Sequence, residues 1–393
     1  MGGAMRVLQL HNHHASLGGA MEVVEHERAL LTAAGHEVRQ YTLPPAQEMG
    51  LSAVRAGAKA VWNREAATET TRRIHRFRPD VVHVHTPFPL MSPSVFRAAK
   101  RAGVPTLVTL HSFRFSCVGA TCHRDGRICE DCVGRRVKWP GVQHRCYHDS
   151  AFGSAALSLG LLTHRMAGTF HHDIDRYLAL TGFARDLMIR DGYPAEKIVV
   201  KPNSVPDCAS VGSPDTERPY LFFAGRLIDI KGVRTLLEAW RRVRHPSLRL
   251  VIAGGGELSG LVEDAAARDH RIEWRGWVDE DAVTGLMSRA MATVVPSQWY
   301  EGLPLVILRS LSVGTPVLVS HLENISKELL EDKAGWSFRM GSSRDLAETI
   351  TTVASDADTA TRLRQQARAS FEMRYSPAVN LRRLEGLYRS LAR

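Results

Sequence analysis

The chain has 393 residues, of which 44% are hydrophobic and 23% are charged, a balance typical of a soluble globular protein with enough sequence for two domains. No apolar run reaches the roughly eighteen residues that span a bilayer, and residues 1–10 are too short and too polar for a signal peptide, so we expect a cytoplasmic protein. The net charge of +10 favours contact with phosphates, nucleic acid or anionic headgroups, although any single basic cluster is more typical of a solvated helix face.

The first half alternates short apolar strands with helical patterns, which predicts a parallel sheet covered on both faces. We predict strands at 6–10, 37–41, 81–85, 106–110, 176–180 and 198–201, and helices at 19–34, 64–77, 92–102, 151–170 and 183–191. A linker rich in Pro, Ser and Asp follows at 202–219. Residues 1–205 are therefore interpreted as one α/β domain, with a cysteine-rich insertion at 112–148.

The second half repeats the scheme and is interpreted as a second α/β domain over 206–376. We predict strands at 220–224, 249–253, 272–274, 292–295 and 316–319, and helices at 232–244, 258–269, 279–289, 304–313, 344–354 and 359–374. A last helix at 377–391, within a C-terminal segment 377–393, is expected to cross back to the first domain. Ligands of such sheets bind beyond the carboxyl ends of strands, so we expect a cleft between two facing sheets.

The segment after the strand at 292–295 is the most informative part of the chain. It reads Pro296-Ser297-Gln298-Trp299-Tyr300-Glu301-Gly302-Leu303-Pro304-Leu305 and leads into a helix. A helix that begins at the carboxyl end of a strand offers free backbone N–H groups to a phosphate. The carboxylate of Glu301 can hold sugar hydroxyls beside it, so the pattern predicts a nucleotide-sugar site.

A second loop, Gly225 to Gly232, follows the first strand of the second half and carries Arg226 and Lys231. Two cations at a helix start suit a diphosphate that gains negative charge as it leaves. An ordinary basic loop would look the same in isolation, and the neighbouring Glu301 segment favours the phosphate site.

Two further strand ends carry weaker signals. Gly18-Gly19 opens the first helix and allows close approach of backbone or ligand. Because the full dinucleotide-binding fingerprint is missing, we do not expect a nicotinamide cofactor. His111 ends the strand at 106–110, where it could bind a hydroxyl or a phosphate. A buried structural histidine is the simpler interpretation of His111 taken alone.

Five of the six cysteines fall within thirty residues, and Cys129-x-x-Cys132 has the spacing of zinc ligands. We choose Cys117, Cys129, Cys132 and Cys146 as a closed structural zinc site and leave Cys122 outside it. Little apolar sequence surrounds these loops, and a metal would explain how they hold together. Five reduced thiols, or one disulfide, are the alternatives.

Taken together, these motifs resemble glycosyltransferase family 4, a retaining family with the GT-B fold of two Rossmann-like domains. The resemblance runs from end to end, and its middle is similar to a bacterial polysaccharide-biosynthesis subgroup. It covers Gly18-Gly19, Pro79 to His85, Thr109-Leu110-His111, Lys201-Pro202-Asn203, Gly225-Arg226-Leu227 with Lys231-Gly232, Ala253 to Gly256, Pro296 through Glu301 to Val317, and the cysteine pattern with Arg124-Asp125-Gly126, Trp139-Pro140 and His144 to Tyr147.

The resemblance implies a UDP- or GDP-sugar donor and roles for individual residues. Arg226 and Lys231 would hold the donor diphosphate, Glu301 the transferred sugar, and His111 the sugar near the reaction centre. Gly18, Gly19, Gly302, Leu303, Pro304, Leu305 and Arg309 would line the donor site. Retention in this fold is read as front-face substitution without a side-chain nucleophile, so catalysis is mainly positioning and needs no metal.

One position departs from the family pattern. A second Glu, which binds ribose hydroxyls, is expected eight positions after Glu301, and here that position is Arg309, which only donates hydrogen bonds. Glu323-Asn324 also stand where a small turn containing Gly is usual.

We therefore expect a cytoplasmic, or membrane-peripheral, hexosyltransferase acting on a glycan, lipid-linked or small-molecule acceptor. A degenerate relative that binds ligands without turnover is the alternative. A zinc-stabilised nucleic-acid binder ranks last, because the sequence contains no reading module, and we expect no nucleic-acid partner.

Overall fold

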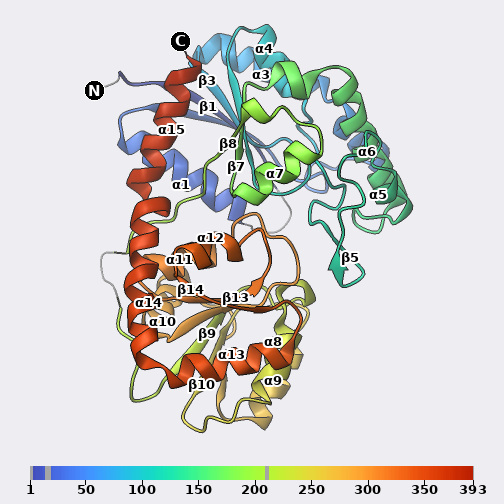
Figure 1. The fold of residues 1–393 in the computed structure, drawn as a ribbon. Coiled ribbons are helices and arrows are strands. Elements are labelled where there is room, and N and C mark those ends of the chain that lie inside the picture. Colours follow the sequence, from blue (N-terminus) through green and yellow to red (C-terminus); the bar gives the residue numbers. More distant parts are fainter. Residues whose placement is uncertain (1–2, 14–18, 209–211, 393) are drawn as a thin grey trace. The chain divides into compact units, whose positions relative to one another are not determined.

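The computed structural model describes residues 3–13, 19–208 and 212–392 of the chain, which form two compact units. The first unit comprises Met1–Arg124, Cys129–Asn203 and Asn380–Arg393. The second comprises Ser204–Val379 together with Asp125–Ile128. Each unit is built around its own parallel sheet (Figure 1).

The sheet of the first unit has six strands in the order β2-β1-β3-β4-β7-β8. The strands are β1 (Arg6–Asn12), β2 (Glu37–Leu43), β3 (Val81–Thr86), β4 (Thr106–Leu110), β7 (Arg176–Ala179) and β8 (Ile198–Val200). Every neighbouring pair is parallel. The order reverses between β1 and β3, so the carboxyl ends of these two strands mark the topological switch point where ligands of such sheets bind.

Helices cover this sheet, and a cysteine-rich segment extends beyond it. The helices are α1 (Gly19–Ala33), α2 (Ala53–Val61), α3 (Arg64–Phe77), α4 (Ser94–Arg101), α5 (Trp139–Gln143), α6 (Ala151–Met166) and α7 (Gly182–Arg190), with the short turn η2 (Ala195–Lys197). Side-chain caps begin α3 at Asn63 and α6 at Ser150. A two-stranded hairpin of β5 (His123–Arg124) and β6 (Arg127–Ile128) lies in the cysteine-rich segment.

The sheet of the second unit repeats this topology, in the order β11-β10-β9-β12-β13-β14. Its strands are β9 (Tyr220–Ala224), β10 (Arg249–Ala253), β11 (Ile272–Trp274), β12 (Ala292–Val295), β13 (Val317–His321) and β14 (Gly335–Arg339). The strands are again parallel, and the order reverses between β9 and β12. The loops after β9 and β12 therefore meet at the switch point of this unit.

The helices of the second unit pack on both faces of its sheet and enclose a core that includes the fully buried Trp240. They are η3 (Asp229–Lys231), α8 (Val233–Trp240), α9 (Ser259–Arg268), α10 (Glu280–Arg289), α11 (Leu305–Ser312), α12 (Ser326–Glu331), α13 (Ser343–Ser355), α14 (Ala357–Ser370) and η4 (Phe371–Tyr375).

The last helix, α15 (Pro377–Leu391), completes the core of the first unit. Its Leu384 and Tyr388 are fully buried and pack in a cluster with Val7, Val81 and Leu178. The Asn380 amide donates to the carbonyl of Pro202 at 3.1 Å. Figure 1 shows the helix running alongside the first sheet.

Most predicted elements are confirmed, including the last helix with its bounds, while six helices and strands were missed and two helices were predicted about four residues too long. The missed elements are α2, α5, α12, β5, β6 and β14, all of nine residues or fewer, and short segments give too little repeat to identify an element from sequence. The helix predicted over 232–244 ends at Trp240. The helix predicted over 151–170 ends at Met166, because Gly168 takes a left-handed φ of 74° and the π-helical turn η1 (Thr169–Asp173) follows. Among the described helices, none has the length and apolar character to cross a bilayer.

Candidate functional site

In the second unit, the loops after β9 and β12 are held in close contact by a glycine. Gly232 has a φ of 73°, and a Cβ at this position would lie 1.8 Å from the carbonyl oxygen of Pro296. Only glycine allows this approach. The backbone N–H of Gln298 also donates to the backbone carbonyl of Ile230 at 2.9 Å. These contacts bring Lys231 and Glu301 together from positions seventy residues apart.

Lys231 and Glu301 form the central polar pair of this site. The Lys231 ammonium lies 2.8 Å from both carboxylate oxygens of Glu301 and 5.7 Å from the ring centre of Trp299. The Ser297 hydroxyl donates to Glu301 at 2.5 Å, and the carboxylate is largely buried. The pair therefore has a defined geometry before any ligand binds, as an oriented binding site requires.

The remaining predicted residues of this unit lie on the same two loops as the pair or on the helix that follows. Arg226 is exposed in the loop after β9, on the same segment as Lys231. Gly302, Leu303 and Pro304 lead into α11 at Leu305, and no side chain caps the N-terminus of this helix. Its first N–H groups therefore remain available to an anion.

The two positions that depart from the family pattern also have defined contacts. The Arg309 guanidinium lies 2.8 Å from a carboxylate oxygen of Glu280 on α10. Asn324 is buried, and its amide donates to the backbone carbonyl of Glu301 at 2.5 Å. Asn324 thus supports the acidic loop from the adjoining segment.

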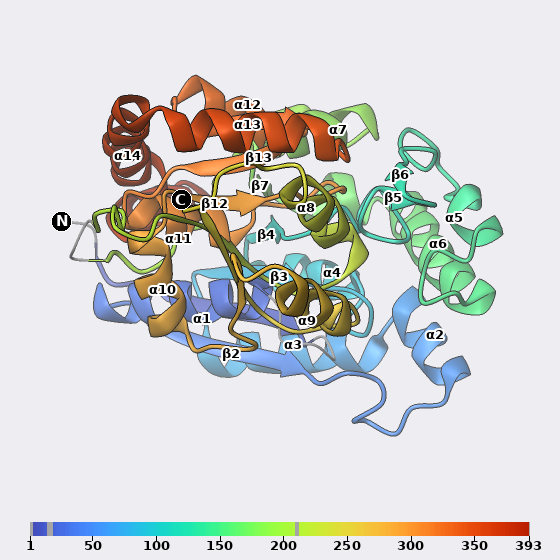
Figure 2. The same ribbon diagram turned by 90° about the horizontal axis from the view of Figure 1, so that it is seen from below.

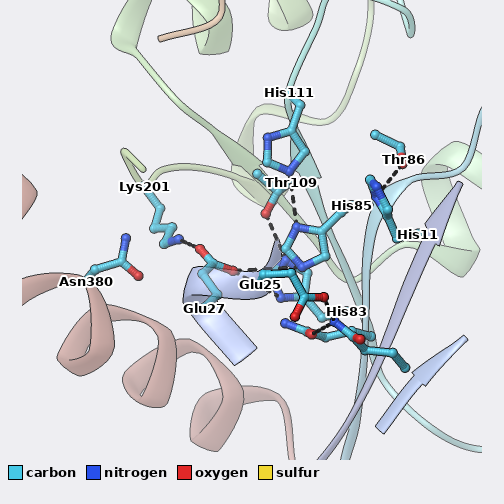
Figure 3. A network of polar contacts seen from close by, with 12 residues as sticks. His11, Glu25, Glu27, His83, His85, Thr86, Thr109, His111, Lys201 and Asn380 are labelled. Atoms are coloured by element: carbon cyan, nitrogen blue, oxygen red, sulfur yellow. Dashed lines mark hydrogen bonds and ion pairs between the residues drawn. The ribbon is translucent and has the colours of Figure 1, made fainter. Parts of the chain in front are cut away.

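The first unit contains a buried network of histidines and charged groups, drawn in Figure 3. Glu27 on α1 pairs with Lys201, which follows β8, and both side chains are fully buried. The second carboxylate oxygen of Glu27 lies 3.9 Å from Nδ1 of His83 and 3.8 Å from Nε2 of His85. His83 also contacts the hydroxyls of Tyr388 and Thr109, each at 2.8 Å.

His111 connects this network to a small cavity. Its Nε2 lies 3.1 Å from Nδ1 of His85, and the two rings stack with centres 5.4 Å apart. Both residues line a cavity of about 40 Å³ near the carboxyl ends of β3 and β4. Sequence reasoning placed His111 at such a site, but it missed the buried network behind the ring.

Burial lowers the pKa of His83 and of His85 well below the ordinary histidine value, so both rings are neutral at neutral pH. Among the described residues, Glu27, His83 and His85 are the one group whose ligand atoms lie close enough together to hold a metal ion. The Lys201 ammonium on the same carboxylate disfavours a further cation there. The network is better suited to orient His111 than to bind a metal.

Of the two glycines predicted to line the donor site, the structure describes one. Gly18 lies outside the described residues, and Gly19 is the exposed first residue of α1.

The four cysteines predicted as zinc ligands line a single small cavity. Cys117, Cys129, Cys132 and Cys146 surround a space of about 20 Å³, and Cys122 does not line it. Backbone N–H groups of Gly119 and Cys122 donate to the sulfur of Cys117, and those of Gly141 and Val118 donate to Cys132. A hydrogen bond from the Cys122 thiol is the main reason that the pKa of Cys117 falls to about 6. Within the described part of the chain, no three of the four sulfur atoms lie within 4.8 Å of one another.

Several residues of these sites were not identified from the sequence. Ser297 and Asn324 support Glu301, while Glu27 and Lys201 form the buried pair behind His85. The sequence did contain two signals, an acidic residue on the buried face of α1 and a lysine directly after β8. Neither signal indicates which residue the side chain would pair with.

Two protein families match the sequence. The first half, residues 18–204, matches the family described as glycosyl transferase 4-like domain. Residues 209–370 match the family described as glycosyl transferases group 1.

Several curated glycosyltransferases are similar to this chain in sequence. An uncharacterized glycosyltransferase of Methanocaldococcus jannaschii is 33% identical over 32% of this chain and 33% of its own length. A lipopolysaccharide core biosynthesis glycosyltransferase of Rhizobium meliloti is 28% identical over 43% of this chain and 49% of its own length. The matched part thus spans half of these relatives or less. A phosphatidyl-myo-inositol mannosyltransferase of Mycolicibacterium smegmatis is 24% identical over 92% of this chain and 86% of its own length.

Solved structures match over the whole fold. An Anabaena protein in complex with UDP has 16% identity and a TM-score of 0.67, covering 98% of this chain and 99% of that one. Sucrose-phosphate synthase of Thermosynechococcus elongatus has 15% identity and a TM-score of 0.69 with the same coverage. At these identities the likeness establishes the fold.

Proposed function

The chain belongs to the family 4-type glycosyltransferases and has the GT-B fold, and on this premise we propose that it is a retaining hexosyltransferase. It would move a hexose from a UDP- or GDP-sugar to a polysaccharide precursor, a lipid-linked glycan or a small-molecule acceptor. The observation that carries this proposal is the oriented pair of Lys231 and Glu301 beside the uncapped start of α11.

The donor is held, in this proposal, by charge and by backbone groups of the second unit. Arg226, Lys231 and the N-terminus of α11 bind the diphosphate, since cations and free N–H groups both stabilise a phosphate that gains charge as it leaves. Glu301 accepts hydrogen bonds from hydroxyls of the transferred sugar. Because Lys231 already contacts Glu301, the two residues fix the spacing between diphosphate and sugar.

Transfer then proceeds on one face of the sugar. The acceptor oxygen forms a bond to the anomeric carbon as the bond from that carbon to the diphosphate oxygen breaks, and the leaving diphosphate takes the acceptor proton. His111 contacts the donor sugar near this centre. No side-chain nucleophile or metal takes part in the step, so the residues act by positioning and by stabilising charge.

Arg309 favours a second candidate function, a binding protein of the same fold without turnover. Its guanidinium cannot accept the hydrogen bonds of a ribose diol, and it is already engaged with Glu280. In the enzyme proposal, the ribose is bound by other groups.

Calorimetric titration of the full chain with UDP, GDP and their sugars tests the first proposal. We expect micromolar to millimolar binding of one donor and its slow hydrolysis, with transfer on an acceptor panel. If no nucleotide sugar binds, the enzyme proposal is wrong. Binding without hydrolysis or transfer across the panel would instead support the protein without turnover.

The Arg226→Ala variant tests the diphosphate contact. Loss of a charge-assisted hydrogen bond should weaken donor binding by about 2 kcal/mol. Arg234→Ala is the matched control, because Arg234 pairs with Asp229 at the same loop and is exposed. Equal affinity of wild type and Arg226→Ala would remove Arg226 from the site.

We also propose that Cys117, Cys129, Cys132 and Cys146 hold a structural zinc ion. The shared cavity and the N–H groups directed at sulfur fit a thiolate site, and zinc would draw the four sulfur atoms together. Elemental analysis of purified protein should find about one zinc per chain, and Cys132→Ser should lose it. Cys122→Ser should keep it. Less than about half an equivalent in wild-type protein would reject the zinc site.

Finally, we propose that the protein works in the cytoplasm and, where its acceptor is lipid-linked, at the membrane surface. The net charge of +10 supports contact with anionic headgroups.

A further inference from the structure

Helix α6 has an exposed face without charge. Over its sixteen residues, AFGSAALSLGLLTHRM, the helix has no acidic side chain, and its titratable groups are the buried His164 and Arg165 at its end. Surface helices of soluble proteins usually carry charged residues on the solvent side. An exposed helix without them suggests a contact with something other than water.

The exposed positions form one apolar stripe. Phe152, Leu159 and Met166 recur every seven residues, so they lie on one side of the helix, and their exposed fractions are 51%, 52% and 79%. Ala155 is exposed between them. The opposite side of α6 is also apolar, with Leu157 and Leu161 buried in the first unit. On the stripe itself, the ring of Phe152 packs against Gly57 of α2, so the fold uses the stripe at this end, while Leu159 and Met166 stay open to solvent.

The segment that precedes α6 also exposes large apolar side chains. Trp139, the first residue of α5, is 61% exposed, and Val137 before it is exposed as well. Helix α5 packs against α6, and Figure 2 shows α2, α5 and α6 grouped at the edge of the first unit. A tryptophan beside an apolar stripe is characteristic of proteins that rest at a membrane interface.

The sequence around the stripe is rich in basic residues. Residues 132–168 contain five Lys or Arg against one Asp, and Arg135, Arg136 and Arg145 are exposed. At the C-terminal end of α6, a hollow of about 490 Å³ is lined by Arg136, Arg165, His171 and Arg190 together with Leu162 and Met166 of the helix. Asp191 also lines it and pairs with Arg165 at 3.2 Å, so Arg136 and Arg190 carry the excess positive charge of the hollow. Cationic and apolar groups thus lie next to each other, which complements the charged headgroup and the apolar acyl chains of an anionic lipid.

We propose that the face formed by α6 and Trp139 docks the first unit on an anionic lipid bilayer, with Phe152, Leu159 and Met166 in the acyl boundary and a lipid phosphate in the basic hollow. A second copy of the chain is disfavoured as the occupant, because two surfaces with the same positive rim repel each other. An anionic bilayer complements both the charge and the apolar stripe.

This inference deepens the proposed action on lipid-linked acceptors, and it is tested without donor or acceptor. The full chain is sedimented with vesicles of phosphatidylcholine, with and without phosphatidylglycerol. We expect binding that requires phosphatidylglycerol and that weakens as salt is raised. The triple variant Phe152→Ser, Leu159→Ser, Met166→Ser should bind at least about tenfold more weakly, since each exposed apolar side chain adds to partition.

Two further variants separate the contributions. Arg135→Glu with Arg136→Glu should abolish the preference for phosphatidylglycerol while the protein stays folded by circular dichroism. Met373→Ser is the matched control, because Met373 is equally exposed in the second unit, and it should bind as the wild type does. UDP-sugar binding should be unchanged in every variant, so loss of vesicle binding and loss of donor binding are distinguished.

The proposal would be overturned by three results. One is that the wild-type protein sediments with neither kind of vesicle. Another is a triple-serine variant that binds as well as the wild type. The third is a wild-type dimer that the triple-serine variant converts to a monomer in the absence of vesicles, because the stripe would then be covered by a second copy.

Discussion

At the scale of single residues, two ion pairs have different environments and different consequences. Lys231 and Glu301 lie at a loop junction, where the lysine side chain keeps 20% of its surface exposed. Glu27 and Lys201 are fully removed from solvent, so each would be a bare charge in the core without the other. Removing water from two charges is costly, and the attraction between them repays that cost only while both remain.

We expect Glu27→Gln to destabilise the protein by about 3 kcal/mol, because it leaves the Lys201 ammonium buried and unpaired. Urea unfolding of the wild type and the variant measures the difference. The double variant Glu27→Gln, Lys201→Met should recover most of the loss. A single variant within about 1 kcal/mol of wild type would show that Lys201 finds water or another partner.

From the sequence, Lys231 and Glu301 were expected at one site, although not as an ion pair, whereas the buried pair was not predicted at all. Lys231 and Glu301 both follow strands at the switch point, so topology alone places them near each other. Glu27 is in the middle of a helix and Lys201 is 174 positions away, and no periodic pattern relates the two. Such a partner becomes visible only when side chains are packed.

At the scale of elements, α15 is the helix on which the first unit most depends. It supplies Leu384 and Tyr388 to a core whose other members are Met5 and residues of β1, α1, β3, β4 and β7. The hydroxyl of Tyr388 also contacts His83 at 2.8 Å, which links this helix to the network behind His111.

Leu384→Ala should destabilise the first unit by about 3 kcal/mol, since it removes a fully buried side chain and leaves a cavity. Thermal unfolding followed by circular dichroism measures the loss. Arg382→Ala, on the exposed side of the same helix, should change stability by less than about 0.5 kcal/mol. Equal effects of the two substitutions would mean that α15 is not part of this core.

The last helix could be predicted from its own sequence, and the edge strand β14 could not. The helix over 377–391 shows a regular repeat of apolar residues and was predicted with the bounds of α15. In contrast, β14 contains only Trp336 and Phe338 as large apolar residues and pairs at the edge of its sheet. Its pairing with β13, rather than its own sequence, determines that it is a strand.

At the scale of the whole molecule, buried histidines connect stability to pH. Burial lowers the pKa of His164 to about 4, and His83 and His85 shift in the same direction. The ring of His164 stacks on that of Trp62 with the ring centres 4.6 Å apart, and its Nε2 lies 3.1 Å from the carbonyl oxygen of Val61. In the unfolded chain these rings regain the ordinary pKa of about 6.5 and bind protons that the folded chain excludes.

Stability should therefore fall as pH falls through the unfolded pKa toward the folded pKa. For His164 alone, the free energy of unfolding should decrease by about 2 kcal/mol between about pH 7 and pH 5. Urea titrations at several pH values measure the slope, and His164→Gln should reduce it. A stability that is unchanged over this range would show that His164 is protonated in the folded protein.

The order of synthesis gives α15 a further consequence. The ribosome completes residues 1–203 long before it reaches Asn380, so the nascent first unit emerges without the helix that fills its core. Val7, Val81 and Leu178 stay uncovered until the second unit has been translated. The N-terminal half must therefore wait for the residues of α15 before its core is complete, and a chain truncated before Asn380 would leave the first unit without this helix.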